Sequence, residues 1–278
     1  MKKKLLITDL DNTLYDWVTF YAKSFSAMVS ALGELTGIER SRIISDFKII
    51  NQLHGSSEHP FAALDLPCVQ SHFASSDRAY LGRKLDPAFH EFNRVRKLEL
   101  KLYPSVLETL EKLSSRGVTI IAHTESMYIN AHWRIARLSI EDFFRRIYTL
   151  EGKLPSHPFP GQSPAVPMER IVVVPKEERK PNPDLLRDIC AREGYAPEEA
   201  VYIGDSLVRD VGMAKLAGVT AVWAKYGTLY DRSLWDILVS VTHWSPEDVQ
   251  REQVLRSQFN SVEPDFEASS FEEIKALF

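Results

Sequence analysis

Between about residues 103 and 225 the sequence alternates amphipathic helix patterns with short apolar runs that are rich in β-branched residues. Each run is three to six residues long, which is typical of strands buried on both faces. Such alternation predicts right-handed βαβ crossovers and a parallel sheet that is covered by helices on both sides. The expected strands are 5–7, 118–122, 147–150, 171–174, 201–203 and 219–224.

The stretch 19–102 interrupts this pattern directly after the first strand and changes to a helical pattern, with a polar loop at 54–60. Apolar residues recur at three- and four-residue spacing over 25–35, which predicts one helix that ends at Gly37. Residues 43–50 and 89–102 predict two further helices. The second of these is expected to expose Arg94, Arg96 and Lys97.

An insertion at this point leaves the sheet at the carboxyl end of its first strand. Ligands of open parallel sheets bind beyond that edge, so the insertion is placed to cover a site. We therefore expect a helical cap domain, 19–102, over a core made of 1–18 and 103–278. The loop 54–65 is our candidate for the part of the cap that selects the substrate. Additional helix is expected over 230–260, and a final edge strand and helix over 266–278.

Composition limits the class of protein. Hydrophobic residues make up 44% of the chain and charged residues 26%, as in ordinary globular proteins that are soluble. The net charge of −4 disfavours binding to a nucleic-acid backbone, so no nucleic-acid partner is expected. The apolar run 5–7 is too short for a signal peptide or a membrane span, which makes no membrane partner and a cytoplasmic location the expectation.

Two carboxylates, Asp9 and Asp11, follow the first expected strand directly. Residues two apart on an extended chain point to the same side, so both side chains can face one site. Because like charges at that spacing repel, a hard metal ion or an acid–base pair would explain the pair. On these residues alone, an Asx-turn with Thr13 as a cap is the simpler interpretation.

Two further segments offer groups that bind phosphate. Thr124 follows the strand 118–122, where a hydroxyl and free backbone N–H groups would suit a phosphate oxygen. A plain helix N-cap at Thr124 or Ser126 explains that segment equally well. Lys180 precedes Pro-Asn-Pro, which fixes the start of the next helix and so the direction of the lysine, although surface lysines are common at such places.

The last segment is Gly204-Asp205-Ser206-Leu207-Val208-Arg209-Asp210, directly after the strand 201–203. The glycine permits a tight turn, and both aspartates can then return to the carboxyl edge of the sheet. With Asp9, they would offer a divalent cation the oxygen ligands that it prefers. An aspartate N-cap is the competing interpretation.

Each segment is weak alone, but their order at successive strand ends resembles the four motifs of the haloacid dehalogenase superfamily, in its phosphatase branch. The resemblance covers roughly 1–18 and 103–225, and it implies a Rossmann-like core with a helical cap between the first two motifs. The matching segments are DLDNT at 9–13, the strand ending in Thr124, Lys180, and GDSLVRD at 204–210.

The resemblance implies a role for each matching residue. Asp9 would be the nucleophile that forms an aspartyl-phosphate, and Asp11 the general acid for the leaving alcohol and then the base for water. Thr124 and Lys180 would hold the phosphate. A carboxylate that attacks a phosphate dianion needs cations to screen the repulsion, which agrees with this assignment.

The resemblance also implies a Mg²⁺ site. Asp9, Asp205 and the backbone carbonyl of Asp11 would bind the ion, and Asp210 would support them. The implied substrate is a small phosphorylated metabolite, with nucleotides and sugar phosphates included. A phosphomutase and a non-catalytic scaffold of the same fold are the alternatives, whereas Asp11 argues against dehalogenase chemistry.

Two features depart from the family's pattern. Glu125 follows the motif threonine, and a carboxylate there must turn away from a phosphate or pair with a cation. The segment 154–167 contains five prolines and predicts an inserted surface loop. It makes Lys153 a rival to Lys180, which we prefer because Pro-Asn-Pro follows it.

Overall fold

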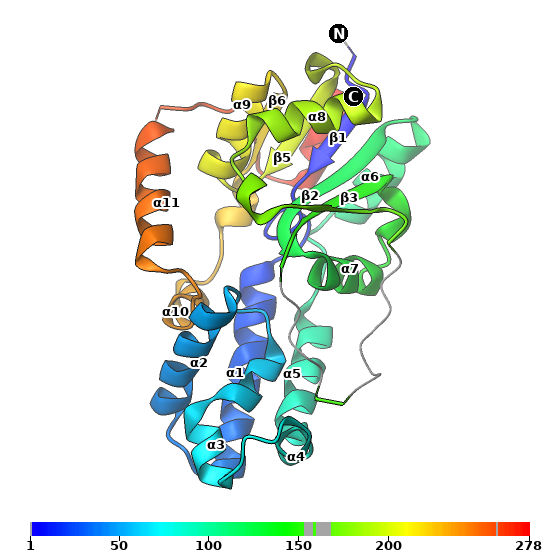
Figure 1. Ribbon diagram of the computed structural model, residues 1–278. Helices are drawn as coiled ribbons and strands as arrows, with labels where there is room; N and C mark the ends of the chain where they lie inside the picture. The colour runs from blue at the N-terminus through cyan, green and yellow to red at the C-terminus, as the bar shows by residue number, and fades with distance from the viewer. Residues whose placement is uncertain (1, 153–157, 160–167, 260) are drawn as a thin grey trace.

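A computed structural model describes residues 2–152, 158–159, 168–259 and 261–278. Seven parallel strands form one sheet in the order β4-β3-β2-β1-β5-β6-β7 (Figure 1). The strands are β1 (Leu5–Thr8), β2 (Thr119–Met127), β3 (Arg146–Leu150), β4 (Ile171–Val174), β5 (Ala200–Gly204), β6 (Thr220–Ala224) and β7 (Phe266–Ala268).

Helices cover both faces of this sheet, as the continuous apolar strands predict. Successive residues of β1 point to opposite faces, so Leu6 belongs to one hydrophobic core and Leu5 and Ile7 to the other. The first core packs against α6 (Val106–Ser115) and α7 (Tyr128–Arg137), and the second against α8 (Pro183–Glu193) and α9 (Met213–Ala217). The predicted α/β class with a Rossmann-like parallel sheet is confirmed.

The insertion after β1 is helical, and Figure 1 shows it beyond the carboxyl ends of the strands. Its first helix begins where the Asp16 carboxylate accepts a hydrogen bond from the Thr19 backbone N–H at 2.8 Å. It ends at Gly37, whose φ of 68° lies in the left-handed region that glycine adopts most readily. The helices are α1 (Trp17–Thr36), α2 (Arg40–His54), α3 (Pro67–Phe73), α4 (Arg78–Lys84) and α5 (Asp86–Glu99).

The two connections between the insertion and the sheet lie side by side. Tyr15 and Leu102 form an isolated antiparallel bridge, and the Tyr103 backbone N–H donates to the Leu14 carbonyl at 2.9 Å. Paired crossing points of this kind are where a hinge between the helices and the sheet would lie. The division into a cap, 19–102, and a core remains a proposal.

The carboxyl-terminal region adds two helices, α10 (Arg232–Ser240) and α11 (Pro246–Gln258), within the predicted stretch 230–260. Helix α10 packs against α1 and α2, and the Asn51 side chain donates to the Val241 carbonyl at 2.8 Å. The predicted edge strand is β7, and the helix after it is a 3₁₀ helix, Phe271–Leu277. No described helix is both long and apolar enough to cross a membrane.

Candidate active site

Asp9 lies at the carboxyl end of the central strand. Its backbone N–H donates to the Ile203 carbonyl of β5 at 2.9 Å, which continues the strand pairing past Thr8. The side chain is buried, and its Oδ1 accepts a hydrogen bond from Lys180 Nζ at 2.7 Å. Burial raises the pKa of Asp9 to about 7, although the Lys180 ammonium opposes that shift.

Lys180 is the cation at the centre of the site. It is 3% exposed, and its Nζ also donates to Asp210 Oδ1 at 2.8 Å. Burial alone would lower the pKa of Lys180, but the carboxylates of Asp210 and Asp9 outweigh it and raise that pKa well above its ordinary value. Asn182 caps α8 by accepting from the Leu185 backbone N–H at 3.0 Å, so the helix start holds Lys180 inward. The alternative of a surface lysine is wrong.

Three carboxylates gather beside this lysine. Oxygen atoms of Asp9, Asp205 and Asp210 all lie within 4.8 Å of one another. Gly204 makes this possible, because a Cβ there would lie 2.3 Å from Asp210 Cγ. Asp210 Oδ2 also accepts from the Ser206 backbone N–H at 3.0 Å. The competing interpretation of an aspartate N-cap is wrong, because the residue that caps the following helical turn is Ser206.

This cluster fits a hard divalent cation. All its donors are carboxylate oxygens, which Mg²⁺ and Ca²⁺ prefer. Desolvation, followed by the negative charges of Asp210 and Asp9, raises the pKa of Asp205 well above its ordinary value. One ammonium, from Lys180, faces three carboxylates, so a further cation would relieve the remaining repulsion.

Thr124 is buried in the neighbouring strand, at the same edge of the sheet. The expected strand 118–122 is too short, because β2 continues to Met127 through an irregular pairing with β3 between His123 and Met127. Helix α7 therefore begins at Tyr128, and neither Thr124 nor Ser126 is its N-cap. Thr124 Oγ1 instead accepts from the Ser126 backbone N–H at 3.1 Å.

Asp11 faces away from the acidic cluster. Its Oδ2 accepts from Ser126 Oγ at 2.7 Å, and its Oδ1 accepts from Arg134 Nη1 at 2.7 Å. Arg134 is 2% exposed and comes from α7. Both oxygens of the Asp11 carboxylate are thus held by partners that the motif analysis did not identify. The assignment of the Asp11 backbone carbonyl to a metal stays a prediction.

The insertion reaches this network through Glu58, which lies in the predicted loop 54–65. Glu58 Oε2 accepts from Arg134 Nη2, and Oε1 accepts from Trp17 Nε1 at 2.6 Å. Burial and the Asp11 carboxylate raise the pKa of Glu58, while Arg134 and Trp17 lower it. One buried guanidinium therefore links the insertion to Asp11.

The structure describes one of the two departures from the family's pattern, Glu125, but little of the other, the proline-rich segment 154–167. Glu125 pairs with Arg209 at 3.2 Å, which is the cation that a carboxylate beside a phosphate site requires. Arg209 also pairs with Glu252 of α11 at 2.8 Å and lies over the Trp244 ring at 5.2 Å. The rival Lys153 lies outside the described residues, as does most of the proline-rich segment 154–167.

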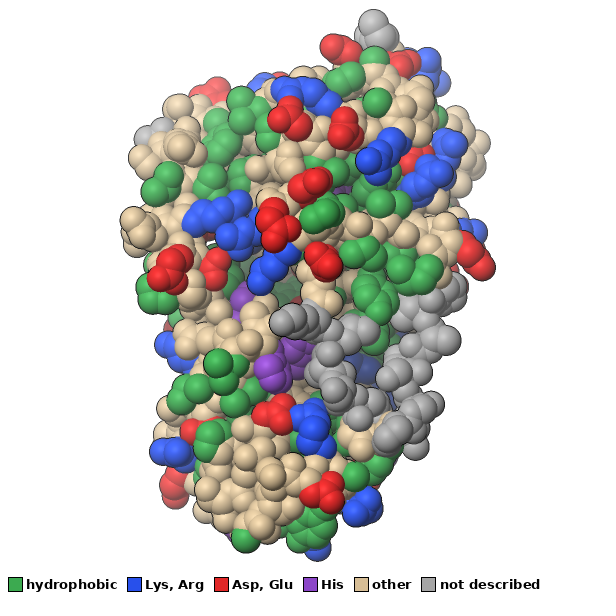
Figure 2. Space-filling view, in the orientation of Figure 1, with side chains coloured by type: hydrophobic (Ala, Val, Ile, Leu, Met, Phe, Trp, Pro, Cys, Tyr) green, Lys and Arg blue, Asp and Glu red, His purple; other side chains and the backbone are tan. Residues whose placement is uncertain are grey.

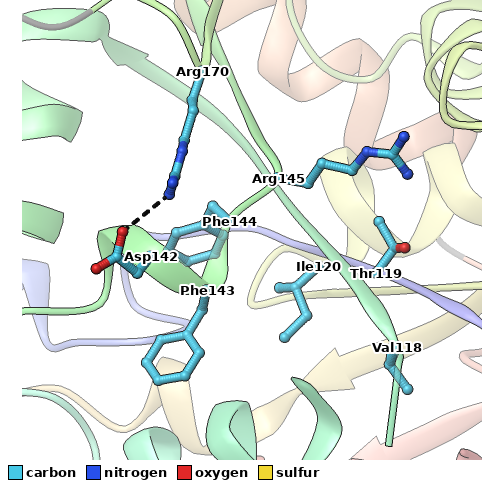
Figure 3. Close-up of a pocket in the computed structure, with 8 residues that line it drawn as sticks. All are labelled: Val118, Thr119, Ile120, Asp142, Phe143, Phe144, Arg145 and Arg170. Carbon is cyan, nitrogen blue, oxygen red and sulfur yellow. Dashed lines mark hydrogen bonds and ion pairs between the residues drawn. The ribbon is translucent and has the colours of Figure 1, made fainter. Parts of the chain in front are cut away.

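A hollow lies at the amino-terminal edge of the sheet, opposite the edge that carries Asp9 and Lys180. It has a volume of about 340 Å³ and opens beside the amino-terminal ends of β2 and β3 (Figure 3). Its charged side chains are partly neutralised, since Arg170 pairs with Asp142 at 3.3 Å. None of the predicted site residues lines it. The lining residues are Val118, Thr119, Ile120, Asp142, Phe143, Phe144, Arg145 and Arg170.

Comparisons with known proteins agree with this architecture. A glyceraldehyde 3-phosphate phosphatase of Methanopyrus kandleri is 27% identical over 232 residues, which are 82% of this chain and 86% of the relative. A phosphoglycolate phosphatase of Mannheimia succiniciproducens is 30% identical over 149 residues, 53% of this chain and 54% of the relative. A solved magnesium-bound hydrolase from Bacillus subtilis, 15% identical, covers 100% of this chain and 99% of its own at a TM-score of 0.50, which shows a shared fold.

The family whose sequence pattern matches is described as haloacid dehalogenase-like hydrolase, and the match spans residues 3–218. That span runs through the first strand, the helical insertion and the sheet as far as the end of α9. It contains Asp9, Thr124, Lys180 and the Asp205–Asp210 segment, which the fold brings to one edge of the sheet. The chain therefore belongs to the haloacid dehalogenase-like hydrolases.

Proposed function

We propose that this protein is a magnesium-dependent phosphomonoester hydrolase that acts through an aspartyl-phosphate on a small phosphorylated metabolite. One observation carries the proposal: the Asp9 carboxylate accepts a hydrogen bond from buried Lys180 and lies within 4.8 Å of two further carboxylates. Cations beside such a nucleophile reduce its repulsion from the phosphate that it attacks. The names of the two phosphatase relatives support the phosphate ester as the substrate.

In the proposed reaction, a carboxylate oxygen of Asp9 attacks phosphorus while the bond to the leaving alcohol breaks. Lys180 and Thr124 would bind the phosphate oxygens, because Lys180 donates to Asp9 and Thr124 follows the part of β2 that pairs with the end of β1. Mg²⁺, held by Asp9 and Asp205 with Asp210 in support, would neutralise charge on the transferring group. Water then hydrolyses the aspartyl-phosphate and releases inorganic phosphate.

Asp11 would give its proton to the leaving alcohol and then take one from the attacking water. Its two hydrogen bonds, from Ser126 and Arg134, hold the carboxylate in one orientation. The helical insertion would act as a lid that excludes water from the leaving-group side, since Glu58 meets Arg134 beside Asp11.

Hydrolysis of para-nitrophenyl phosphate by the purified protein tests the proposal. We expect release of inorganic phosphate with Mg²⁺, loss of activity in excess chelator, and recovery when Mg²⁺ is restored. Ca²⁺ should inhibit, because its looser coordination permits bidentate binding by the carboxylates. Asp205→Asn should lower activity by about 10²-fold or more, as expected when a metal ligand is lost, whereas Asp184→Asn, an exposed position on α8, should not.

Full activity in excess chelator would contradict the metal site. Transfer of the phosphoryl group back to substrate without release of phosphate would indicate a phosphomutase. An absence of turnover on any phosphate monoester would favour a non-catalytic scaffold.

A further inference from the structure

A second, small cavity lies between the helical insertion and α7. It has a volume of about 20 Å³, which is enough for roughly one water molecule. Helices α1 and α5 form one side and α7 the other, so any movement of the insertion would change its size. The lining residues are Phe20, Tyr21, Glu58, Phe92, Arg96, Asn130, Trp133 and Arg134.

Arg96 of α5 reaches into this cavity, although its helix pattern predicts an exposed side chain. Its guanidinium carbon lies 3.8 Å from the centre of the Trp133 ring and 5.6 Å from that of Phe92. Guanidinium groups stack on aromatic faces and keep their N–H donors free at the edge. Among the described residues, no carboxylate pairs with Arg96, and its buried Nε has no hydrogen-bond partner.

The two carboxylates that pair with Arg134, those of Glu58 and Asp11, are already engaged. Both oxygens of Glu58 accept hydrogen bonds, one from Trp17 and one from Arg134. Both oxygens of Asp11 accept as well, from Ser126 and from Arg134. Burial, followed by the positive charge of Arg134, lowers the pKa of Arg96 to about 10, so the group stays protonated at neutral pH. The cavity therefore has one guanidinium without a counter-charge.

The cavity adjoins the place where the leaving alcohol would lie. The guanidinium of Arg134 donates to Asp11, which is the proposed proton donor to that alcohol, and the same side chain lines the cavity. A substituent on the alcohol carbon would point from Asp11 past Arg134 towards Arg96. The cavity is too small for a nucleobase or a sugar ring, and a carboxylate, with three heavy atoms, would need the insertion to move slightly away from α7.

We propose that this cavity is a subsite for a carboxylate carried by the leaving alcohol, with Arg96 as the residue that selects it. The substrates would then be phosphate esters of small hydroxycarboxylic acids. A carboxylate there would supply the missing partner of Arg96, and the flat guanidinium on Trp133 would present a pair of donors to it. The inference rests on the proposed phosphatase function and narrows its substrate class.

The test compares two substrates of similar size, 2-phosphoglycolate and 2-hydroxyethyl phosphate, in which a carboxylate and a hydroxymethyl group occupy the same position. We expect a higher kcat/KM for 2-phosphoglycolate in the wild-type protein. Arg96→Gln should lower the ratio of the two kcat/KM values by about 10- to 100-fold, the range for one hydrogen bond to a charged group. Arg96→Lys should recover part of the ratio. Arg94→Gln, an exposed position on the same helix that pairs with Glu91, should leave the ratio unchanged.

A second measurement needs no variant, and so covers the case in which Arg96→Gln does not fold. Glycolate should inhibit para-nitrophenyl phosphate hydrolysis competitively, whereas ethylene glycol at the same concentration should not. An active wild-type protein that shows no preference between the two esters, or no inhibition by glycolate, would overturn the subsite alone. Failure of the wild-type protein to hydrolyse para-nitrophenyl phosphate would instead reject the function on which the subsite rests.

Discussion

Two opposing influences act on the charge of the buried Asp9 carboxylate. Burial and the neighbouring carboxylates favour its protonated form, while Lys180 at 2.7 Å favours the ionised form that a nucleophile needs. Lys180 is shared with Asp210 at 2.8 Å, so its charge is divided between two partners. A bound divalent cation would shift the balance further toward ionised Asp9.

Replacement of Asp9 by asparagine tests the nucleophile directly. The amide can still accept the hydrogen bond from Lys180, so we expect a folded protein, but it cannot form the acyl-phosphate. Turnover of para-nitrophenyl phosphate should fall by at least about 10³-fold, with the far-ultraviolet circular dichroism unchanged. A variant that keeps more than a few per cent of wild-type activity would reject Asp9 as the nucleophile.

The role of Asp11 has a different signature, because its proton matters only to a poor leaving group. Asp11→Asn should lower kcat for an alkyl phosphate by about 10²-fold or more, and clearly less for para-nitrophenyl phosphate, whose phenolate leaves without a proton. Thr13→Ser, a neighbour that donates to Asp9 at 3.3 Å, provides the comparison, since it should affect both substrates alike. Equal losses for Asp11→Asn on the two substrates would argue against a general acid.

Sequence reasoning located one part of the site and missed another. Asp9, Lys180, Asp205 and Asp210 stand at strand ends, and parallel strands bring those ends together whatever the loops do. Arg134 lies within a helix, where its inward direction depends on how α7 packs against the sheet and the insertion. No local pattern reports that packing, so a buried arginine there could not be predicted.

At the scale of helices and strands, the predictions from the sequence were wrong where a segment packs against a neighbour from elsewhere in the chain. Strand β2 extends to Met127 although residues 124–126 are polar, because β3 pairs with it at His123 and again at Met127, on either side of an irregular stretch. Arg96 is turned inward for the same reason, since Trp133 of α7 offers an aromatic face. The other core strands were predicted to within one residue at each end, and the end of the first helix at Gly37 was predicted correctly.

Glu58 joins the loop after α2 to α7, and its replacement tests that connection. Its carboxylate accepts from Arg134 and Trp17 in a buried setting, and its loss would leave Arg134 with Asp11 as the remaining carboxylate partner. We expect Glu58→Gln to lower the free energy of unfolding by about 1–3 kcal/mol in urea titrations. Glu91→Gln removes an exposed ion pair with Arg94 and should cost less than about 1 kcal/mol. Equal costs would show that the Glu58 contact does not stabilise the protein.

At the scale of the whole molecule, three histidines lie where the insertion meets the sheet-bearing part. His54 ends α2, His59 follows in the loop, and His243 lies between α10 and α11. Figure 2 shows histidine side chains on this face, midway along the molecule. The rings of His54 and His59 are 5.6 Å apart, and His54 Nε2 lies 3.7 Å from a carboxylate oxygen of Asp65. Protonation of His59 would therefore add positive charge beside a second imidazole in a buried setting.

Acid should accordingly weaken the molecule through His59. Burial, followed by His54 and His243, lowers the pKa of His59 to about 4, while an unfolded histidine has a pKa of about 6.5. Between these values the unfolded state binds more protons, so stability is complete above pH 6.5 and falls as the pH drops towards 4. The loss from this group can reach about 2–3 kcal/mol.

In urea unfolding at pH 7 and pH 4.5, His59→Gln should lose correspondingly less stability than the wild-type protein, whereas His90→Gln, an exposed position, should follow the wild type. Parallel losses in all three proteins would place the acid sensitivity elsewhere.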